Sequence, residues 1–93
     1  GAAKAGVIQL TKYYAAYCCP LQINVNSITP GAFPKQSIQE ENPKFIERLC
    51  KKNPLGKIGR PEDICGSILL LSSPASDYIT GQNIIIDGGW TIW

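Results

Sequence analysis

The chain has 93 residues, of which 44% are hydrophobic and 17% are charged, and its formal net charge is +2. This composition indicates a globular domain rather than a disordered chain, and the small net charge argues against a nucleic-acid-binding protein. The sequence contains neither an apolar run long enough to cross a bilayer nor a cationic amphipathic segment suited to a membrane surface.

The first predicted element is an alanine-rich helix over residues 1–18, which ends before Pro20 because proline cannot continue a helix. Its apolar arc is wider than one packing contact requires. We therefore expect one side to pack against a sheet and the other against a further helix, which a second subunit could supply. The side chains that share the main apolar face are Val7, Leu10, Tyr14, Tyr17 and Cys18.

The second predicted element is a strand, because Ile23, Val25 and Ile28 alternate with polar residues. Pro30 is expected to end this strand, since proline lacks the N–H that a strand ladder needs, and Gly31 is expected to permit a turn. In an open α/β sheet, ligands bind beyond the carboxyl ends of the strands. The turn at residues 30–31 therefore marks the candidate ligand site.

Residues 32–59 form a long polar excursion with two predicted short helices. One begins near Ser37, which has capping-box spacing to Glu40. The other begins at Asn42 and Pro43, an N-cap residue followed by a first-turn proline. Loops of this length usually have a role, so we expect a substrate loop or lid, and a plain connection is the alternative.

The next predicted helix opens at Pro61, where the acidic residues that follow complement the helix dipole, and closes near Pro74. Its expected apolar face consists of Ile64, Cys65, Ile68, Leu69 and Leu71. The chain then turns at residues 80–81 into a strand over residues 83–87, where three consecutive isoleucines favour burial on both faces, and residues 88–89 end it.

The predicted order is helix, strand, helix, helix, strand, which indicates a single partial α/β domain over residues 1–93 with a right-handed parallel crossover. Two parallel strands are too few to form an independently stable sheet, and the free edge of the first strand invites further pairing. We therefore expect a further part of the sheet or an oligomeric partner, here a second copy of the chain, to complete the fold.

The cysteines argue against a metal site, because no C-x-x-C pair occurs and histidine is absent. Cys18, Cys50 and Cys65 each fall on an apolar helical face, where a reduced cysteine behaves as a small hydrophobic residue, and the sequence leaves open whether all four stay reduced. A reducing, cytoplasmic setting follows as the expectation, with neither a signal peptide nor a metal cofactor.

Four motifs in a fixed order carry a resemblance that spans essentially the whole chain. They lie at residues 1–7, 24–31, 54–63 and 78–90. Together they resemble the C-terminal part of a short-chain dehydrogenase/reductase, similar to gluconate dehydrogenase or a related sugar or polyol reductase. The resemblance implies a C-terminal fragment of a doubly wound, Rossmann-type parallel sheet. It also implies an NAD(P)-dependent oxidoreductase that interconverts an alcohol and a ketone.

The resemblance assigns Lys4 to catalysis and cofactor binding. In the family, such a lysine hydrogen-bonds the ribose of NAD or NADP and lowers the pKa of a tyrosine hydroxyl that exchanges a proton with the substrate. The tyrosine is expected immediately before Gly1. The family's glycine-rich loop and active-site serine are also expected upstream, so we expect the isolated chain to be inactive and to bind no cofactor.

The resemblance also assigns Pro30, Gly31, Ala32 and Phe33 to cofactor binding, where they back the nicotinamide ring and bond its carboxamide. Many members have a threonine where this chain has Lys35. That difference leaves no expected side-chain hydrogen bond to the cofactor at this position.

Plain alternatives remain for several residues. Lys4 could be an exposed lysine at a helix start, and Asn24 and Asn26 could satisfy neighbouring backbone groups. Trp90 and Trp93 could be terminal packing residues or subunit contacts. The alternative for the whole chain is a self-associating module without catalytic activity that derives from such an enzyme.

Overall fold

The computed structural model describes residues 2–92 and confirms an α/β order with two strands. Three α-helices separate the strands, where the predicted order had two, because the segment around Ser37 forms a helix of its own. Three short 3-10 turns complete the chain. The main elements are α1 (Ala2–Cys18), β1 (Ser27–Pro30), α2 (Gln36–Glu41), α3 (Pro43–Cys50), α4 (Glu62–Leu71) and β2 (Asn83–Ile86).

The chain forms two compact units, each with parts from distant stretches of sequence. The first unit comprises residues up to 29 together with residues 65–84, and the second comprises residues 30–64 together with residues 85 onward. The first unit contains α1, most of α4 and the beginnings of both strands. The second unit contains α2, α3 and the ends of both strands, where the sequence predicts the ligand site.

β1 and β2 pair in parallel, as predicted. The backbone N–H of Ser27 donates to the carbonyl of Gln82 at 2.9 Å, and the N–H of Gly31 donates to the carbonyl of Ile86 at 2.8 Å. Both donor and acceptor advance by four residues, so the strands run in the same direction. The expected strand start at Ile23 is wrong, because β1 begins at Ser27.

Residues 23–26 precede the strand and are held by asparagine side chains together with a backbone hydrogen bond from Gly81 N to the carbonyl of Val25 at 2.7 Å. The Asn24 amide donates to the carbonyls of Ser76 at 3.2 Å and Asp77 at 3.0 Å, and the Asn26 amide donates to the carbonyl of Ile79 at 3.0 Å. The interpretation that these asparagines satisfy backbone groups is confirmed. The segment before β2 is thereby fastened to the segment before β1 within the first unit.

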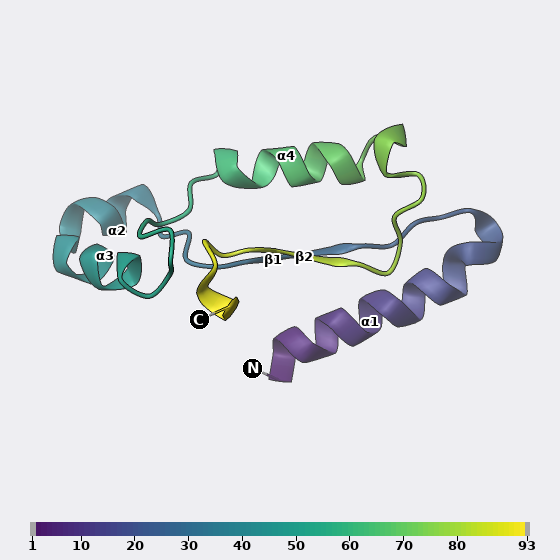
Figure 1. Ribbon diagram of the computed structural model, residues 1–93, viewed down its shortest axis with the longest axis horizontal. Helices are drawn as coiled ribbons and strands as arrows, with labels where there is room; N and C mark the ends of the chain where they lie inside the picture. Colours follow the sequence, from purple (N-terminus) through teal and green to yellow (C-terminus); the bar gives the residue numbers. More distant parts are fainter. Residues whose placement is uncertain (1, 93) are drawn as a thin grey trace. The chain divides into compact units, whose positions relative to one another are not determined.

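The first unit shows α1 and α4 on opposite sides of the strand pair (Figure 1). The buried side of α1 is formed by Thr11 and Ala15. The large side chains of the predicted apolar face are exposed in this chain, where Leu10, Tyr14 and Tyr17 are 54%, 50% and 69% exposed, so the packing predicted for this face stays a prediction. Ala15 lies close to the turn at residue 81, because a Cβ on Gly81 would be 3.5 Å from the Ala15 Cβ.

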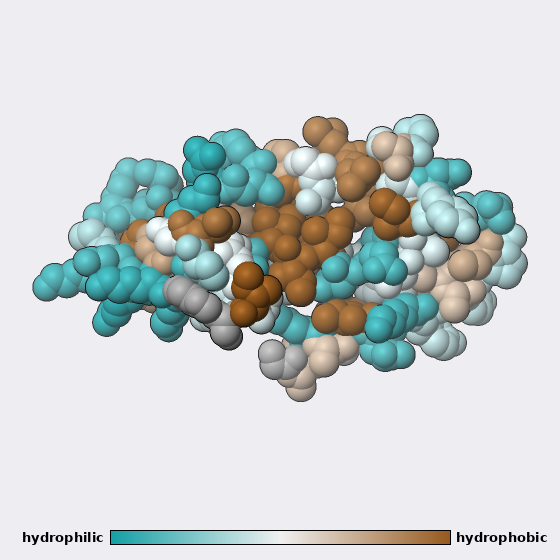
Figure 2. Space-filling view, in the orientation of Figure 1, coloured by the Kyte–Doolittle hydropathy of each residue, from teal (hydrophilic) through white to brown (hydrophobic). Residues whose placement is uncertain are grey.

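Little of the predicted apolar face of α4 is buried. Ile68 and Leu69 are exposed, and Figure 2 shows apolar side chains at the surface over this helix. Among residues 2–92, Ala15 is the only apolar residue that is fully buried, whereas Thr11, Asn53 and Ser76 are buried polar residues. The prediction that further protein covers these faces stays a prediction.

In the second unit, α2 and α3 contact one another within the segment over residues 32–59. The predicted capping role of Ser37 is wrong, because α2 begins one residue earlier with Lys35 as its N-cap. Asn42 is the N-cap of α3 and Pro43 its first residue, as predicted, although the Asn42 side chain makes no capping hydrogen bond.

Three further expectations from the sequence concern a membrane-spanning helix, a metal site and disulfide bonds. Within residues 2–92, no helix combines the length and apolar character needed to cross a bilayer. The same residues contain no cluster of three or more potential metal ligands, and Cys18, Cys19, Cys50 and Cys65 form no disulfide among them. Trp93, named above as a possible interface residue, lies outside the described residues.

Candidate functional site

Three segments of the second unit meet where β1 and β2 end. They are residues 31–33 after β1, residues 86–88 at the end of β2, and residues 53–59, where the chain returns from α3. Each pair of segments is joined by a backbone hydrogen bond, so the three form a closed ring. The bonds run from Gly31 N to Ile86 O at 2.8 Å, from Gly59 N to Ala32 O at 2.8 Å, and from Leu55 N to Gly88 O at 3.2 Å.

Gly31 is required by a close contact rather than by its backbone conformation. Its φ lies outside the left-handed region, so the predicted need for a turn that favours glycine is wrong. A Cβ at this position would lie 2.7 Å from both Cα and Cβ of Asp87. Real Cβ atoms essentially never approach other atoms so closely, so the main chains after β1 and β2 can meet only if residue 31 has no side chain.

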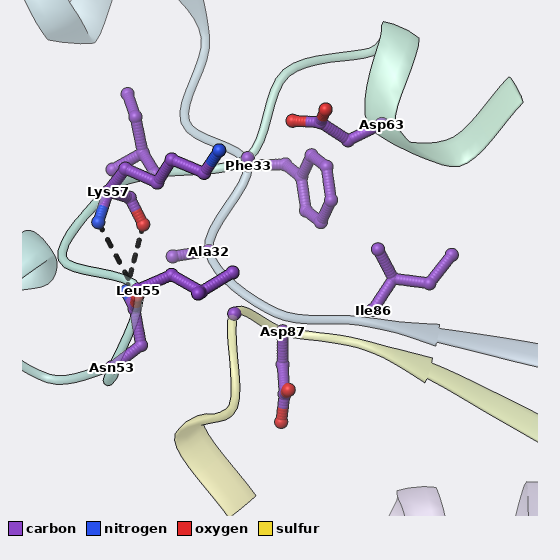
Figure 3. A pocket seen from close by; sticks show the side chains of 11 residues that line it. Ala32, Phe33, Asn53, Leu55, Lys57, Asp63, Ile86 and Asp87 are labelled. Carbon is purple, nitrogen blue, oxygen red and sulfur yellow. Dashed lines mark hydrogen bonds between the residues drawn. The ribbon is translucent and has the colours of Figure 1, made fainter.

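The ring of segments encloses a pocket of about 190 Å³ (Figure 3). The Phe33 side chain extends over it, and a Cβ at Gly59 would overlap the Phe33 ring. Apolar side chains form much of the wall, and the charged Lys57 and Asp63 contribute at its edge. The lining residues are Ala32, Phe33, Asn53, Leu55, Lys57, Ile58, Gly59, Asp63, Ile86, Asp87 and Gly88.

Asp63 has a local partner and so does not present a free carboxylate to the pocket. Its Oδ2 accepts a hydrogen bond from the backbone N–H of Arg60 at 2.8 Å, and its Oδ1 lies 3.8 Å from the Arg60 guanidinium. This contact fixes the start of α4, as predicted from the acidic first turn. The wall beside it is left as a largely apolar surface suited to a flat or aliphatic group.

Asp87 holds the chain together just after β2. Its carboxylate accepts hydrogen bonds from the backbone N–H groups of Gly89 at 2.9 Å and Thr91 at 3.0 Å. Partial burial raises the pKa of this carboxyl group, but the backbone hydrogen bonds lower it by more, so the pKa lies below its ordinary value. Figure 3 shows the Asp87 side chain directed away from Phe33, which indicates a structural role.

Because the pKa of Asp87 is lower in the folded state, its ionised form favours folding, and that contribution is lost as pH falls below about 4, near the carboxyl pKa of the unfolded chain. We expect Asp87→Asn to have a lower thermal midpoint than wild type at pH about 6, and the difference between the two midpoints to be smaller at pH about 3. Thermal unfolding followed by circular dichroism at both pH values measures this. Asp77→Asn is the control, because the Asp77 carboxylate makes no hydrogen bond within residues 2–92. The same difference in thermal midpoint at both pH values would contradict the lowered pKa of Asp87.

The structure brings together four of the five predicted site residues. Pro30 ends β1 and is exposed, and Gly31, Ala32 and Phe33 follow it into the ring of segments. Lys4 is exposed on α1 in the first unit and makes no ion pair with any residue in the described part of the chain. Its role in catalysis and cofactor binding stays a prediction.

Sequence reasoning missed the contribution of the return segment to this site. Asn53, Leu55 and Gly59 line the pocket. Their positions in the sequence place them in the predicted substrate loop, and Leu55 and Gly59 also in the motif at residues 54–63, but none of them was predicted as a site residue. The available signal was glycine at positions 31 and 59, because a Cβ at either position would overlap a neighbouring residue. Such long-range contacts become visible only when the tertiary structure is known.

Comparison with known proteins supports a family assignment for nearly the whole chain. A family model described as Enoyl-(Acyl carrier protein) reductase matches residues 1–91. The chain is 35% identical over 94 residues to galactitol 2-dehydrogenase (L-tagatose-forming) of Cereibacter sphaeroides. That match covers 99% of this chain and 37% of the relative.

Solved structures agree with the sequence match. A short-chain dehydrogenase from Leptospira borgpetersenii with bound NAD+ is 46% identical with a TM-score of 0.82, and the match covers 95% of this chain and 33% of that one. A gluconate 5-dehydrogenase from Burkholderia cenocepacia in complex with NADP and tartrate is 34% identical with a TM-score of 0.86. In that case the match covers 99% of this chain and 37% of the other.

The chain therefore spans only about a third of the length of these relatives. Its two parallel strands with flanking helices correspond to part of a Rossmann-type sheet. Sequence motifs, strand pairing and fold similarity thus lead to one assignment: the chain belongs to the short-chain dehydrogenase/reductase family, and it matches the C-terminal segment of that family's fold.

Proposed function

We propose that this chain is a segment of an NAD(P)-dependent oxidoreductase that interconverts an alcohol and a ketone. The observation that carries the proposal is the pocket at the carboxyl ends of two parallel strands, where Gly31 meets Asp87 without room for a side chain. Ligands of open α/β sheets bind beyond such strand ends. The names of the galactitol and gluconate dehydrogenases favour a polyol or sugar acid as the substrate class.

The residues after β1 fit the nicotinamide end of a dinucleotide. Gly31 allows close approach of the backbone, and Ala32 and Phe33 offer an apolar surface for a flat ring. We propose that residues 30–33 back the ring and that their backbone bonds its carboxamide. When bound, the cofactor would supply or accept the hydride, and this segment would orient it.

Lys4 is the proposed cationic partner of the proton-transferring group. Its ammonium would hydrogen-bond the cofactor ribose and lower the pKa of a tyrosine hydroxyl one helical turn away. A cation beside a phenol stabilises the phenolate, so the tyrosine can exchange a proton with the substrate near neutral pH. The exposed position of Lys4 on α1 leaves its ammonium available for such a contact.

The segment over residues 32–59 is the proposed substrate loop. It leaves the carboxyl end of β1, carries α2 and α3, and returns at residues 53–59 to line the pocket. An excursion of this kind can close over a substrate and exclude water. The pocket wall and the mobile part of the site would thus come from the same stretch of sequence.

The second candidate is a self-associating, non-catalytic module. It is favoured by the large apolar side chains that the first unit exposes on α1 and α4, among them Leu10, Tyr17 and Leu69. Contiguous exposed apolar surface commonly marks an interaction site. In this reading a homodimer or higher oligomer of the chain, in the cytoplasm, would be the functional form, without bound NAD or NADP and without turnover.

Two measurements on the natural protein separate the candidates. Intact mass spectrometry gives the length of the natural polypeptide, and the absorbance of reduced nicotinamide follows its turnover with a panel of polyols, sugar acids and their ketones. NAD(P)-dependent turnover by a longer polypeptide would support the oxidoreductase. A natural polypeptide of this length that associates with rising concentration and turns over none of the panel would support the module.

A further inference from the structure

The side chain of Asn53 is a buried polar group at the point where the chain returns from α3. It is only 4% exposed and makes hydrogen bonds in two directions. Its Nδ2 donates to the carbonyl of Lys57 at 2.9 Å and to that of Leu49 at 3.4 Å, and its Oδ1 accepts from the N–H of Lys57 at 3.4 Å. One side chain therefore joins the end of α3 to the loop over residues 53–57, and Figure 3 shows its hydrogen bonds to Lys57.

Asn53 also meets the end of β2. A Cβ at Gly88 would lie 2.7 Å from the Asn53 Oδ1, and a Cβ at Gly89 would lie 3.1 Å from the ring of Pro54. Leu55 N donates to the carbonyl of Gly88 at 3.2 Å, which fixes the same contact through the backbone. Gly88 and Gly89 have positive φ values of 65° and 90°, so this turn needs glycine for its conformation as well as for space.

We call the contact between residues 53–55 and residues 88–89 the Asn53 latch. Further contacts connect it to the proposed nicotinamide surface. Gly59, at the end of the return segment, donates from its N–H to the carbonyl of Ala32 and lies directly against the Phe33 ring. A shift of the return segment would therefore move two of the pocket walls together. All of these contacts lie within the second unit.

We propose that Asn53 is a positioning residue that fastens the return segment of the proposed substrate loop to the end of β2 and so places that segment against the substrate. The inference rests on the proposed function, because it concerns the substrate loop of that same site. Asn53 does not contact the reacting atoms in this scheme. It acts through the backbone of residues 55–59, which is tied to both strand ends.

The test compares Asn53→Ala and Asn53→Asp with Gln9→Ala in the polypeptide at its natural length. Gln9→Ala is the control, because it removes an exposed side-chain amide from α1, outside the proposed substrate loop and the pocket. Asn53→Asp keeps the volume of the side chain but removes the Nδ2 donor. Both Asn53 variants should speed amide hydrogen exchange at Leu55 and Gly59 by about tenfold or more, and exchange in α1 should stay unchanged.

The kinetic readout distinguishes positioning from general loss of stability. Measured well below the unfolding temperature, Asn53→Ala should raise the KM for the alcohol or ketone about tenfold while the Kd of the cofactor changes less than about threefold, because a misplaced substrate loop affects substrate geometry most. Gln9→Ala should match wild type in both constants. Equal changes in KM and cofactor Kd, or none, would overturn the proposal.

A double-mutant cycle tests whether the latch itself carries the effect. Gly88→Ala places its Cβ against Asn53 Oδ1, so truncating Asn53 should relieve part of that damage, and the two effects should be less than additive. If the effects of the two substitutions were strictly additive, the proposed coupling between Asn53 and Gly88 would be wrong. If the wild-type protein shows no turnover, the proposed function fails. The role of Asn53 can still be decided then, from the amide exchange rates at Leu55 and Gly59 and from the double-mutant cycle measured as free energies of unfolding.

Discussion

Replacing Gly31 by alanine should unfold or badly distort the site, with an expected loss of about 3 kcal/mol in the free energy of unfolding. The added Cβ would lie 2.7 Å from the Cα and Cβ of Asp87, and those atoms belong to a strand end that cannot rotate away as a flexible side chain could. The main chains after β1 and β2 would have to separate. The bond from Gly31 N to Ile86 O, at 2.8 Å, would be strained as they do so.

Chemical denaturation of the polypeptide at its natural length measures this effect, with Gly66→Ala as the control. Gly66 lies inside α4, and a Cβ there would meet nothing within 4 Å. Alanine in a helix interior is better than glycine by roughly 0.5–1 kcal/mol, so the control should keep or raise stability. If Gly31→Ala were as stable as Gly66→Ala, the close contact between the strand ends would not exist in solution.

Replacing Lys4 by alanine should lower kcat by about 100-fold or more while the protein stays folded, if the proposed role is right. The reason is electrostatic: without the ammonium, the tyrosine hydroxyl would return toward its ordinary pKa of about 10 and would transfer its proton poorly near neutral pH. Lys4 is exposed, so its removal should cost little stability. In the direction of alcohol oxidation, where the phenolate acts as the base, the acid limb of the pH profile of kcat should move to higher pH in the variant.

Lys12→Ala is the matched control for Lys4, because it removes an exposed lysine from the same helix. It should leave kcat, the pH profile and the unfolding midpoint close to wild type. Lys4→Arg should restore part of the activity, since a guanidinium keeps the charge but differs in shape and donor geometry. Comparable kcat values for Lys4→Ala and Lys12→Ala would remove Lys4 from the proposed mechanism.

The order of elements and the position of the site could be predicted from local signals. Pro20 and Pro43 mark helix boundaries, Gly81 marks the turn before β2 with a φ of 74°, and the isoleucines of β2 favour a strand. Where local signals competed, the prediction failed. Ile23 and Val25 alternate with polar residues like a strand, but the neighbouring asparagines bind the backbone of residues 76–79, and the Val25 N–H donates to the Thr80 hydroxyl rather than to a backbone carbonyl.

By itself the sequence determined the end of α1, the start of α3, the parallel pairing of β1 with β2 and the position of the pocket after Pro30, because proline, glycine and β-branched residues constrain the backbone where they occur. Only the tertiary structure decided which groups build the site. The need for Gly31 arises from Asp87, that for Gly59 from Phe33, and part of that for Gly88 from Asn53. Each partner is distant in sequence, and contact between main chains leaves no periodic pattern for a sequence to reveal.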